Sequence, residues 1–169
     1  MTLPARLEPE GVIRKSSMST DIPPGFLPLN LVMGFLGANG PLYGRWDGER
    51  LAMGFRVEPR HCNPGQVAHG GMMATFADML LPIASRLQSK IDMGFLPTVN
   101  LSCDFLGPAP LGAWIEGRAE VLKTTRNLLF AQGLATADGE PVLRANGIFK
   151  ITATRAGDFS RDALFGLKS

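Results

Sequence analysis

The stretch HCNPGQVAHGGMMATFADMLL, residues 61–81, joins a polar loop to an apolar run with helical spacing. Gly70 and Gly71 mark the start of a predicted helix that extends to about Lys90. This run carries one acid, Asp78, among Met, Phe, Ala and Leu. A carboxylate in apolar surroundings is costly unless it is paired or used in chemistry. Asp78 is therefore the first candidate for a functional residue.

The sequence on either side of this helix predicts an α+β fold. Residues 41–59 hold the pair Asp47-Gly48 between two short runs, which is typical of a β-hairpin because its turn needs positive φ. After the helix the apolar period changes to two. Strands are predicted at 96–106, 111–124, 127–137 and 141–154. One long helix with about six mostly antiparallel strands is an α+β arrangement.

The two ends of the chain are predicted to differ from this folded part. Residues 1–24 are polar and predict a flexible N-terminal arm, and 155–169 predict a loosely attached C-terminal tail. A single domain is predicted over 25–154. Its first segment, 25–38, is apolar with helical spacing and predicts a short helix, broken at Gly34 or ending near Gly37. We expect that helix to cover the core or a ligand channel.

Composition excludes several classes of protein. The 169 residues suit one domain with a core, and 45% hydrophobic with 19% charged residues is ordinary globular material. A net charge of +2 without blocks of like charge argues against a nucleic-acid partner, and no apolar run approaches the ~20 residues of a membrane span. The cysteines, Cys62 and Cys103, form no CxxC pair, which favours free thiols in a reduced, cytoplasmic setting. Two His and two Cys make a poor set of metal ligands, so no metal is expected.

The residues around the start of the helix suit the chemistry of a carbonyl group. A helix N-terminus presents unpaired N–H groups, and glycines at 70 and 71 let another atom approach them closely. Asn63, in the preceding loop, adds a side-chain N–H donor, although an Asn-Pro pair also suits a plain turn. Asp78 would supply a base or nucleophile, or else a structural acid. Donors for a developing oxyanion together with a carboxylate predict acyl transfer or hydrolysis.

Helix geometry separates these groups within one chain. From Gly70 to Asp78 is eight residues, or roughly 12 Å along the helix axis. A reacting base must lie about 3 to 3.5 Å from its target, or reach it through one water. If both ends act on one substrate, the simplest solution is a dimer with antiparallel helices, in which each site takes its donors from one subunit and its carboxylate from the other.

The residues His61, Asn63, His69, Gly70, Gly71 and Asp78 resemble the motif of the hotdog-fold acyl-CoA thioesterases of the phenylacetate-pathway type. The segments 98–110 and 123–152 are similar to later strands of that family. The resemblance implies a hotdog fold, with a central helix wrapped by the sheet, in homodimers that often pair into homotetramers. It implies a hydrolase acting on acyl-CoA without a bound cofactor.

The same resemblance implies roles for individual residues. Asn63 and the Gly70 N–H would hold the thioester carbonyl, with Gly71 beside them, and Asp78 of the partner subunit would attack it or activate water. Thr98 falls where the family often has a Ser or Thr that positions this water. The family's contacts to the coenzyme A nucleotide fall on the turn Lys123, Thr124, Thr125, Arg126 and Asn127. Two cations there would suit phosphates.

Other interpretations of single residues stay open. His69 is either a general base or, as we favour, a residue that fixes the loop by hydrogen bonding, and His61 is expected to be structural. A nucleophilic Cys62 beside His61 is disfavoured because neighbours on an extended loop point apart. Lys123 and Arg126 are equally consistent with a solvated hairpin tip. The methionines at 72, 73, 79 and 93 suit either a core or an adaptable pocket for variable acyl chains.

Two other functions compete with acyl-CoA hydrolysis. The chain would bind acyl-CoA or another lipid-like ligand without turnover, or it would act on an acyl-carrier protein. A hydratase is disfavoured because no Asp–His pair is spaced for one helix face. An Asp78→Asn variant separates an enzyme from a binder, because only an enzyme has turnover to lose.

Overall fold

The computed structural model describes residues 21–89, 94–153 and 160–167. The long helix is α2 (Gly70–Gln88), and a 3₁₀ turn at Pro59–His61 precedes the loop that leads into it. Two short helices are α1 (Gly34–Asn39) and α3 (Arg161–Leu164). The strands are β1 (Leu27–Pro28), β2 (Tyr43–Trp46), β3 (Leu51–Arg56), β4 (Thr98–Phe105), β5 (Trp114–Thr124), β6 (Leu128–Ala137) and β7 (Glu140–Lys150).

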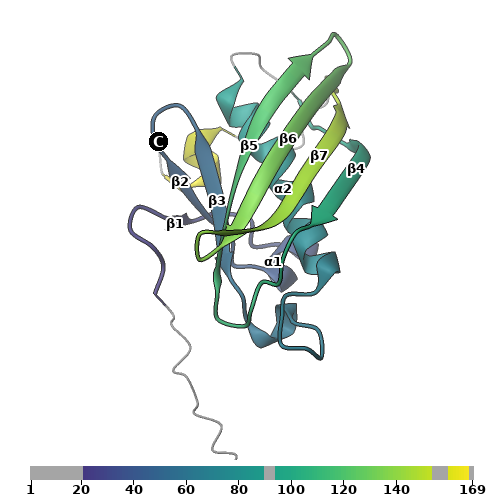
Figure 1. Ribbon diagram of the computed structural model, residues 1–169. Coiled ribbons are helices and arrows are strands. Elements are labelled where there is room, and N and C mark those ends of the chain that lie inside the picture. The colour runs from purple at the N-terminus through teal and green to yellow at the C-terminus, as the bar shows by residue number, and fades with distance from the viewer. Residues whose placement is uncertain (1–20, 90–93, 154–159, 168–169) are drawn as a thin grey trace, which may run out of the picture.

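These strands form one sheet in the order β1-β2-β3-β5-β6-β7-β4, and neighbouring strands pair antiparallel. Helix α2 lies against one face of this sheet, as Figure 1 shows, and contacts β3 to β7. The α+β prediction is confirmed, with seven strands in place of about six. Strand β4, which follows the helix in sequence, lies at an edge of the sheet (Figure 1).

The core fills the space between α2 and the sheet. Phe76 of α2 and Phe55 of β3 are fully buried, with ring centroids 5.2 Å apart. The helix approaches the sheet closely where the strands carry glycine. A Cβ on Gly117 would lie 2.6 Å from a Leu80 methyl carbon, and one on Gly133 would lie 3.0 Å from Leu81. Small residues in β5 and β6 therefore set how deeply α2 packs.

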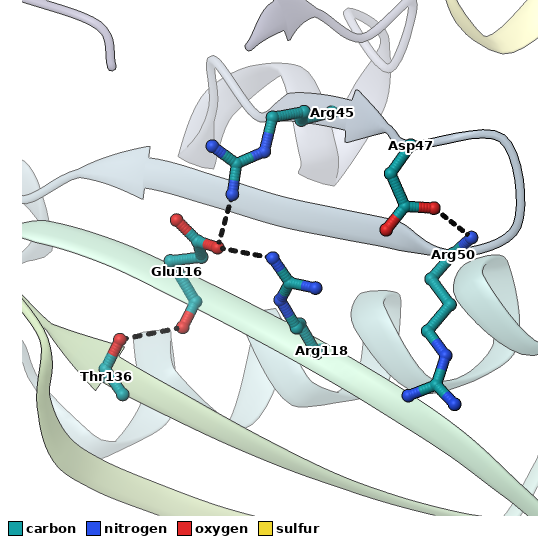
Figure 2. A network of polar contacts seen from close by, with 6 residues as sticks. All are labelled: Arg45, Asp47, Arg50, Glu116, Arg118 and Thr136. Carbon is teal, nitrogen blue, oxygen red and sulfur yellow. Dashed lines mark hydrogen bonds and ion pairs between the residues drawn. The ribbon is translucent and has the colours of Figure 1, made fainter. Parts of the chain in front are cut away.

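The opposite face of the sheet carries charged side chains. Because Gly117 faces α2, its neighbours Glu116 and Arg118 point away from the helix. Figure 2 shows the Glu116 carboxylate accepting from Arg45 of β2 at 3.0 Å and from Arg118 at 3.5 Å. These pairs are solvent-accessible, so each contributes roughly 0–1 kcal/mol. They link β2 to β5 across β3.

The Asp47-Gly48 hairpin is confirmed. Asp47 Oδ1 accepts from the backbone N–H groups of Arg50, at 2.7 Å, and of Glu49, at 3.0 Å, and these bonds lower the pKa of its carboxyl. Figure 2 shows the bond to Arg50. Gly48 supplies a positive φ of 104°.

The prediction of one helix over 25–38 is wrong. Residues 27 and 28 pair with β2, and α1 begins only at Gly34. Pro28 lacks the N–H that a helix needs, and Gly34 takes a φ of 60°, which a right-handed helix does not use. The apolar spacing at 29, 32, 33 and 36 thus belongs to an extended segment and a single short helix.

The ends of the chain are described in part. Residues 1–20 lie outside the described residues, so most of the predicted arm is not tested. Helix α2 ends at Gln88 and not near Lys90, and β7 ends at Lys150 and not at residue 154. The tail predicted as loosely attached is packed in its described part, because Leu164 of α3 is buried in the core. Its carbonyl accepts from the Asn30 N–H at 2.7 Å.

Candidate active site

The start of α2 is capped by a side chain. His69 is the N-cap residue, and its Nδ1 accepts a hydrogen bond from the Gly71 N–H at 2.8 Å. This contact fits the loop-fixing role favoured for His69 from the sequence. The Gly71 N–H is used in this cap. Within the described chain the Gly70 N–H makes no hydrogen bond, which leaves it as the donor at the helix start.

Asn63 lies in the loop before α2 and organises it. Its Oδ1 accepts from the Gly65 N–H at 2.8 Å, and its backbone N–H donates to the Val67 carbonyl at 2.9 Å. Asn63 is half-buried. The turn interpretation is thus confirmed. Because the turn uses only the side-chain oxygen, the amide Nδ2 remains available as a donor among the described residues.

His61 joins three segments of the chain. Its side chain is buried, its Nδ1 accepts from the Glu58 N–H at 3.0 Å, and its Nε2 donates to the carbonyl of Asn39, at the end of α1, at 3.1 Å. Its own carbonyl accepts from the His69 N–H at 2.7 Å. Burial lowers the pKa of His61, so the neutral ring is favoured. The structural interpretation of His61 fits these contacts.

The two cysteines are free thiols. Burial raises the pKa of Cys62, whose Sγ lies 3.4 Å from the Glu58 carbonyl, and this disfavours a nucleophilic thiolate. Burial, followed by the carboxylates of Asp104 and Asp78, raises the pKa of Cys103. Among the described residues no group of three His, Cys, Asp or Glu is placed to hold a metal ion.

Asp78 and Thr98 form a direct pair. The Thr98 hydroxyl donates to Asp78 Oδ1 at 2.6 Å, a length typical of a strong, charge-assisted hydrogen bond. Asp78 is half-buried and Thr98 is exposed. The sequence predicted both residues, and the structure brings them together although they are 20 positions apart.

The pair lies at a cleft of about 240 Å³, which we call the Asp78 cleft. Helix α2 lines it with Met79, Pro82, Ile83 and Arg86. The segment 94–98 forms another wall, and Leu31 and Leu36 come from the N-terminal part of the chain. The apolar wall at 95–97 was not singled out from the sequence, because nothing local shows that it faces Asp78.

Asp78 and Gly70 do not converge within one chain. Eight residues of α2 separate them, roughly 12 Å along the axis. Asp78 and Gly70 also lie beside opposite ends of strand β4. Thr98 begins the strand beside Asp78, whereas the ring of Phe105, which ends it, lies 3.5 Å from where a Gly70 Cβ would be.

The turn between β5 and β6 lies at the Thr98 end of the sheet. Its backbone is anchored where the Ile151 N–H donates to the Asn127 carbonyl, and the next residue back, Lys150, bonds to the Pro97 carbonyl. Thr125 holds the turn internally, since its hydroxyl accepts from the Leu128 N–H at 2.9 Å. Of the residues predicted as the turn 123–127, Lys123 and Thr124 end β5, and 125–127 form the turn. Thr124 is half-buried, and the other four are exposed.

The methionines divide between the two roles that the sequence left open. Met72 and Met73 are buried in the core, and Met79 lines the Asp78 cleft. Met93 lies outside the described residues. In the described part of the chain no helix is long and apolar enough to cross a membrane.

Comparison with known proteins places this arrangement in a family. A Pseudomonas aeruginosa protein, provisionally named as an esterase, is 33% identical over 132 residues, which cover 78% of this chain and 98% of that protein. The family model described as the thioesterase superfamily matches residues 65–143. The chain belongs to the thioesterase superfamily.

Further similarities agree with this assignment. Mouse acyl-coenzyme A thioesterase 13 is 30% identical over 83 residues, covering 49% of this chain and 58% of the mouse protein. The crystal structure of zebrafish thioesterase superfamily member 2 is 26% identical, with a TM-score of 0.63 over 70% of this chain and 87% of that one. Proteins named for phenylacetic acid degradation share the fold. The resemblance to hotdog-fold thioesterases is confirmed at the level of family and fold.

Proposed function

We propose that this superfamily member is an acyl-CoA thioesterase, which hydrolyses a thioester to a free acid and coenzyme A. The observation that carries the proposal is the Asp78–Thr98 pair at the polar end of an apolar cleft. An acyl group in the cleft would bring its carbonyl carbon beside the Asp78 carboxylate. The name of the mouse relative supports acyl-CoA as the substrate class.

The reaction needs one base or nucleophile and one site for negative charge. Either Asp78 takes a proton from water, which adds to the carbonyl carbon, or its carboxylate adds directly and water later cleaves the anhydride. In both routes the C–S bond breaks, and the coenzyme A thiolate leaves and takes up a proton. Thr98 donates to one Asp78 oxygen and so orients the carboxylate, and its hydroxyl oxygen would accept a hydrogen bond from the water. No metal or bound cofactor takes part.

The oxyanion site is proposed to come from a second subunit. Edge strand β4 exposes apolar side chains, with Val99 60% and Phe105 57% accessible. A long, unpaired edge is a template for another strand. Antiparallel pairing of β4 with its own copy would set Thr98 opposite the partner's Phe105. The Gly70 N–H and Asn63 amide of one subunit would then face Asp78 of the other.

The proposal also covers the nucleotide of coenzyme A, the cellular compartment and the assembly of subunits. Lys123, at the end of β5, and Arg126, in the β5–β6 turn, lie at the Thr98 end of the sheet and would bind the phosphates of the nucleotide. The two free thiols suit a reduced, cytoplasmic setting. That two dimers pair into a tetramer stays a prediction, which the molar mass from light scattering would test.

Release of free thiol from a panel of short, long and aryl acyl-CoAs tests this function. Wild type should release thiol from at least one member. Asp78→Asn and Asp78→Ala should lose activity by about 10²–10⁴-fold, the usual contribution of general-base catalysis, while Asp78→Asn keeps binding. A matched control is Asp162→Asn, which removes a half-exposed carboxylate that pairs with Arg161.

Three other outcomes would contradict the proposal. A wild-type dimer that binds acyl-CoA without releasing thiol would be the non-catalytic binding protein. Thiol release from acyl-carrier protein alone would make the carrier-bound thioester, and not acyl-CoA, the substrate. Equal activity of the Asp78→Asn variant and the wild type would remove Asp78 from the mechanism.

A further inference from the structure

One wall of the Asp78 cleft comes from a distant part of the sequence. Leu31 and Leu36 line the cleft together with Met79 and Ile83, more than 40 residues later in the chain. Leu36 belongs to α1, and Leu31 lies in the extended segment before it. Both leucines are half-buried.

This wall is fixed in place at both ends. Before it, the Asn30 N–H donates to the Leu164 carbonyl of α3 at 2.7 Å. After it, the carbonyl of Asn39 accepts from His61 Nε2 at 3.1 Å. The position of α1 is therefore set by the chain itself, before any ligand is present.

Helix α1 contributes little to the core. None of its six residues is buried, and Phe35 is 67% accessible. A helix that served only to cover the core would bury its apolar side chains. Because α1 places Leu36 in the wall of the cleft, we expect α1 to act on the ligand that the cleft binds.

The cleft has a direction and a limited size. Asp78 and Thr98 are at one end, and Arg86, eight residues or about 12 Å further along α2, is at the other. Arg86 Nη1 donates to the Gly94 carbonyl at 2.9 Å, which holds the 94–98 wall in place there. A volume of about 240 Å³ exceeds the ~150 Å³ of a cavity that binds benzene, and lies below the usual range of pockets for large ligands.

We propose that α1 sets acyl specificity, with Leu36 as the main specificity-determining residue and Leu31 in support. This inference rests on the proposed function and names its substrate class. The preferred acyl group is apolar and holds one aromatic ring or an aliphatic chain of medium length. Its carbonyl lies at Asp78, and its far end meets Leu36, Ile83 and the Gly94 side of the 94–98 wall.

Two substitutions change the size of the cleft in opposite directions. Leu36→Trp places an indole in it, and Leu36→Ala enlarges it. The matched control is Phe35→Ala, the adjacent α1 residue, which is exposed and does not line the cleft. Thermal unfolding of all three variants shows whether α1 stays folded.

Hydrolysis of acetyl-, hexanoyl-, octanoyl-, benzoyl- and palmitoyl-CoA is the first readout. Leu36→Trp should lower kcat/KM at least ten-fold for octanoyl- and benzoyl-CoA, and less than three-fold for acetyl-CoA, because only larger groups reach α1. Leu36→Ala should move the optimum to a longer chain. Phe35→Ala should keep the wild-type profile. Equal changes across the whole panel in the Leu36 variants would overturn the proposal.

Calorimetric binding of the free acids is the second readout and needs no turnover. Wild type should bind octanoate more tightly than acetate, and Leu36→Trp should lose this preference. If no acyl-CoA is hydrolysed but the preference exists and depends on Leu36, the proposed function fails and the role of α1 stands. If hydrolysis occurs and Leu36→Trp retains the preference for octanoate, the role of α1 fails and the proposed function stands.

Discussion

A site divided between two subunits predicts that two inactive variants restore each other. Asp78→Ala removes the carboxylate, and Asn63→Ala removes a donor from the oxyanion side. Roughly 12 Å of helix separates the Gly70 donor from Asp78, against the 3 to 3.5 Å that a reaction needs. A mixed dimer should therefore contain one site with both changes and one site with neither.

The expected recovery follows from counting. Equimolar chains that reassemble at random give half mixed dimers, each with one intact site of two, so activity should reach about a quarter of wild type. Each variant alone should retain less than about 1% of wild-type activity, as is usual on loss of a base or an oxyanion donor. The assay is thiol release after joint refolding of the two chains.

A control pair separates complementation from refolding effects. Asp78 and Thr98 act from the same chain, so mixing Asp78→Ala with Thr98→Ala should give no activity beyond that of Thr98→Ala. Recovery in this control pair, or none between Asp78→Ala and Asn63→Ala in a confirmed mixed dimer, would refute the shared site.

Three further predictions concern single residues. Thr98→Ala should lower kcat about ten- to a hundred-fold through loss of a hydrogen bond to the Asp78 carboxylate, and Thr98→Ser should recover most of it in the thiol assay. Burial lowers the pKa of His61 from 6.5, so the unfolded state binds protons more readily. Stability from His61 should be complete above that value and decrease as the pH falls below it, and the decrease in Tm from about pH 7 to about pH 5 should be smaller in His61→Gln. Gly117→Ala should reduce the free energy of unfolding by about 1–3 kcal/mol in urea, because its Cβ would lie 2.6 Å from Leu80, whereas no loss would contradict the tight approach of α2.

The elements that the sequence predicted well are those with local causes. The turn at Asp47-Gly48 follows from positive φ and from two backbone bonds to one carboxylate. Helix α2 and the later strands follow from apolar periods of 3.6 and two. Their bounds differ from the predicted ones by a few residues at the ends.

The incorrect prediction of a helix over 25–38 also has a local cause, which the spacing of apolar residues does not reveal. Pro28 and the left-handed Gly34 interrupt a pattern whose apolar positions otherwise suit a helix. The chemistry near His69 was predicted in part. The loop-fixing role of His69 fits the structure. Gly71 was predicted to bind substrate, but its N–H donates to His69 in the helix cap.

The shape of the cleft depends on contacts between distant segments. That Leu36 and Asp78 line the same cleft follows from how α1, α2 and the 94–98 segment pack, and no short-range pattern encodes it. The position of β4 at the sheet edge is similarly non-local, since it pairs with β7 and not with the strand next to it in sequence.

The open edge of β4 also bears on the life of a newly made chain. Its accessible Val99 and Phe105 flank a row of backbone groups that a strand of any origin can pair with. If a second copy covers this row, mass action makes each chain more stable as the protein becomes more abundant. At low abundance the uncovered form is the one that proteases and aggregates encounter. Expression level then governs the lifetime of the protein as well as its amount.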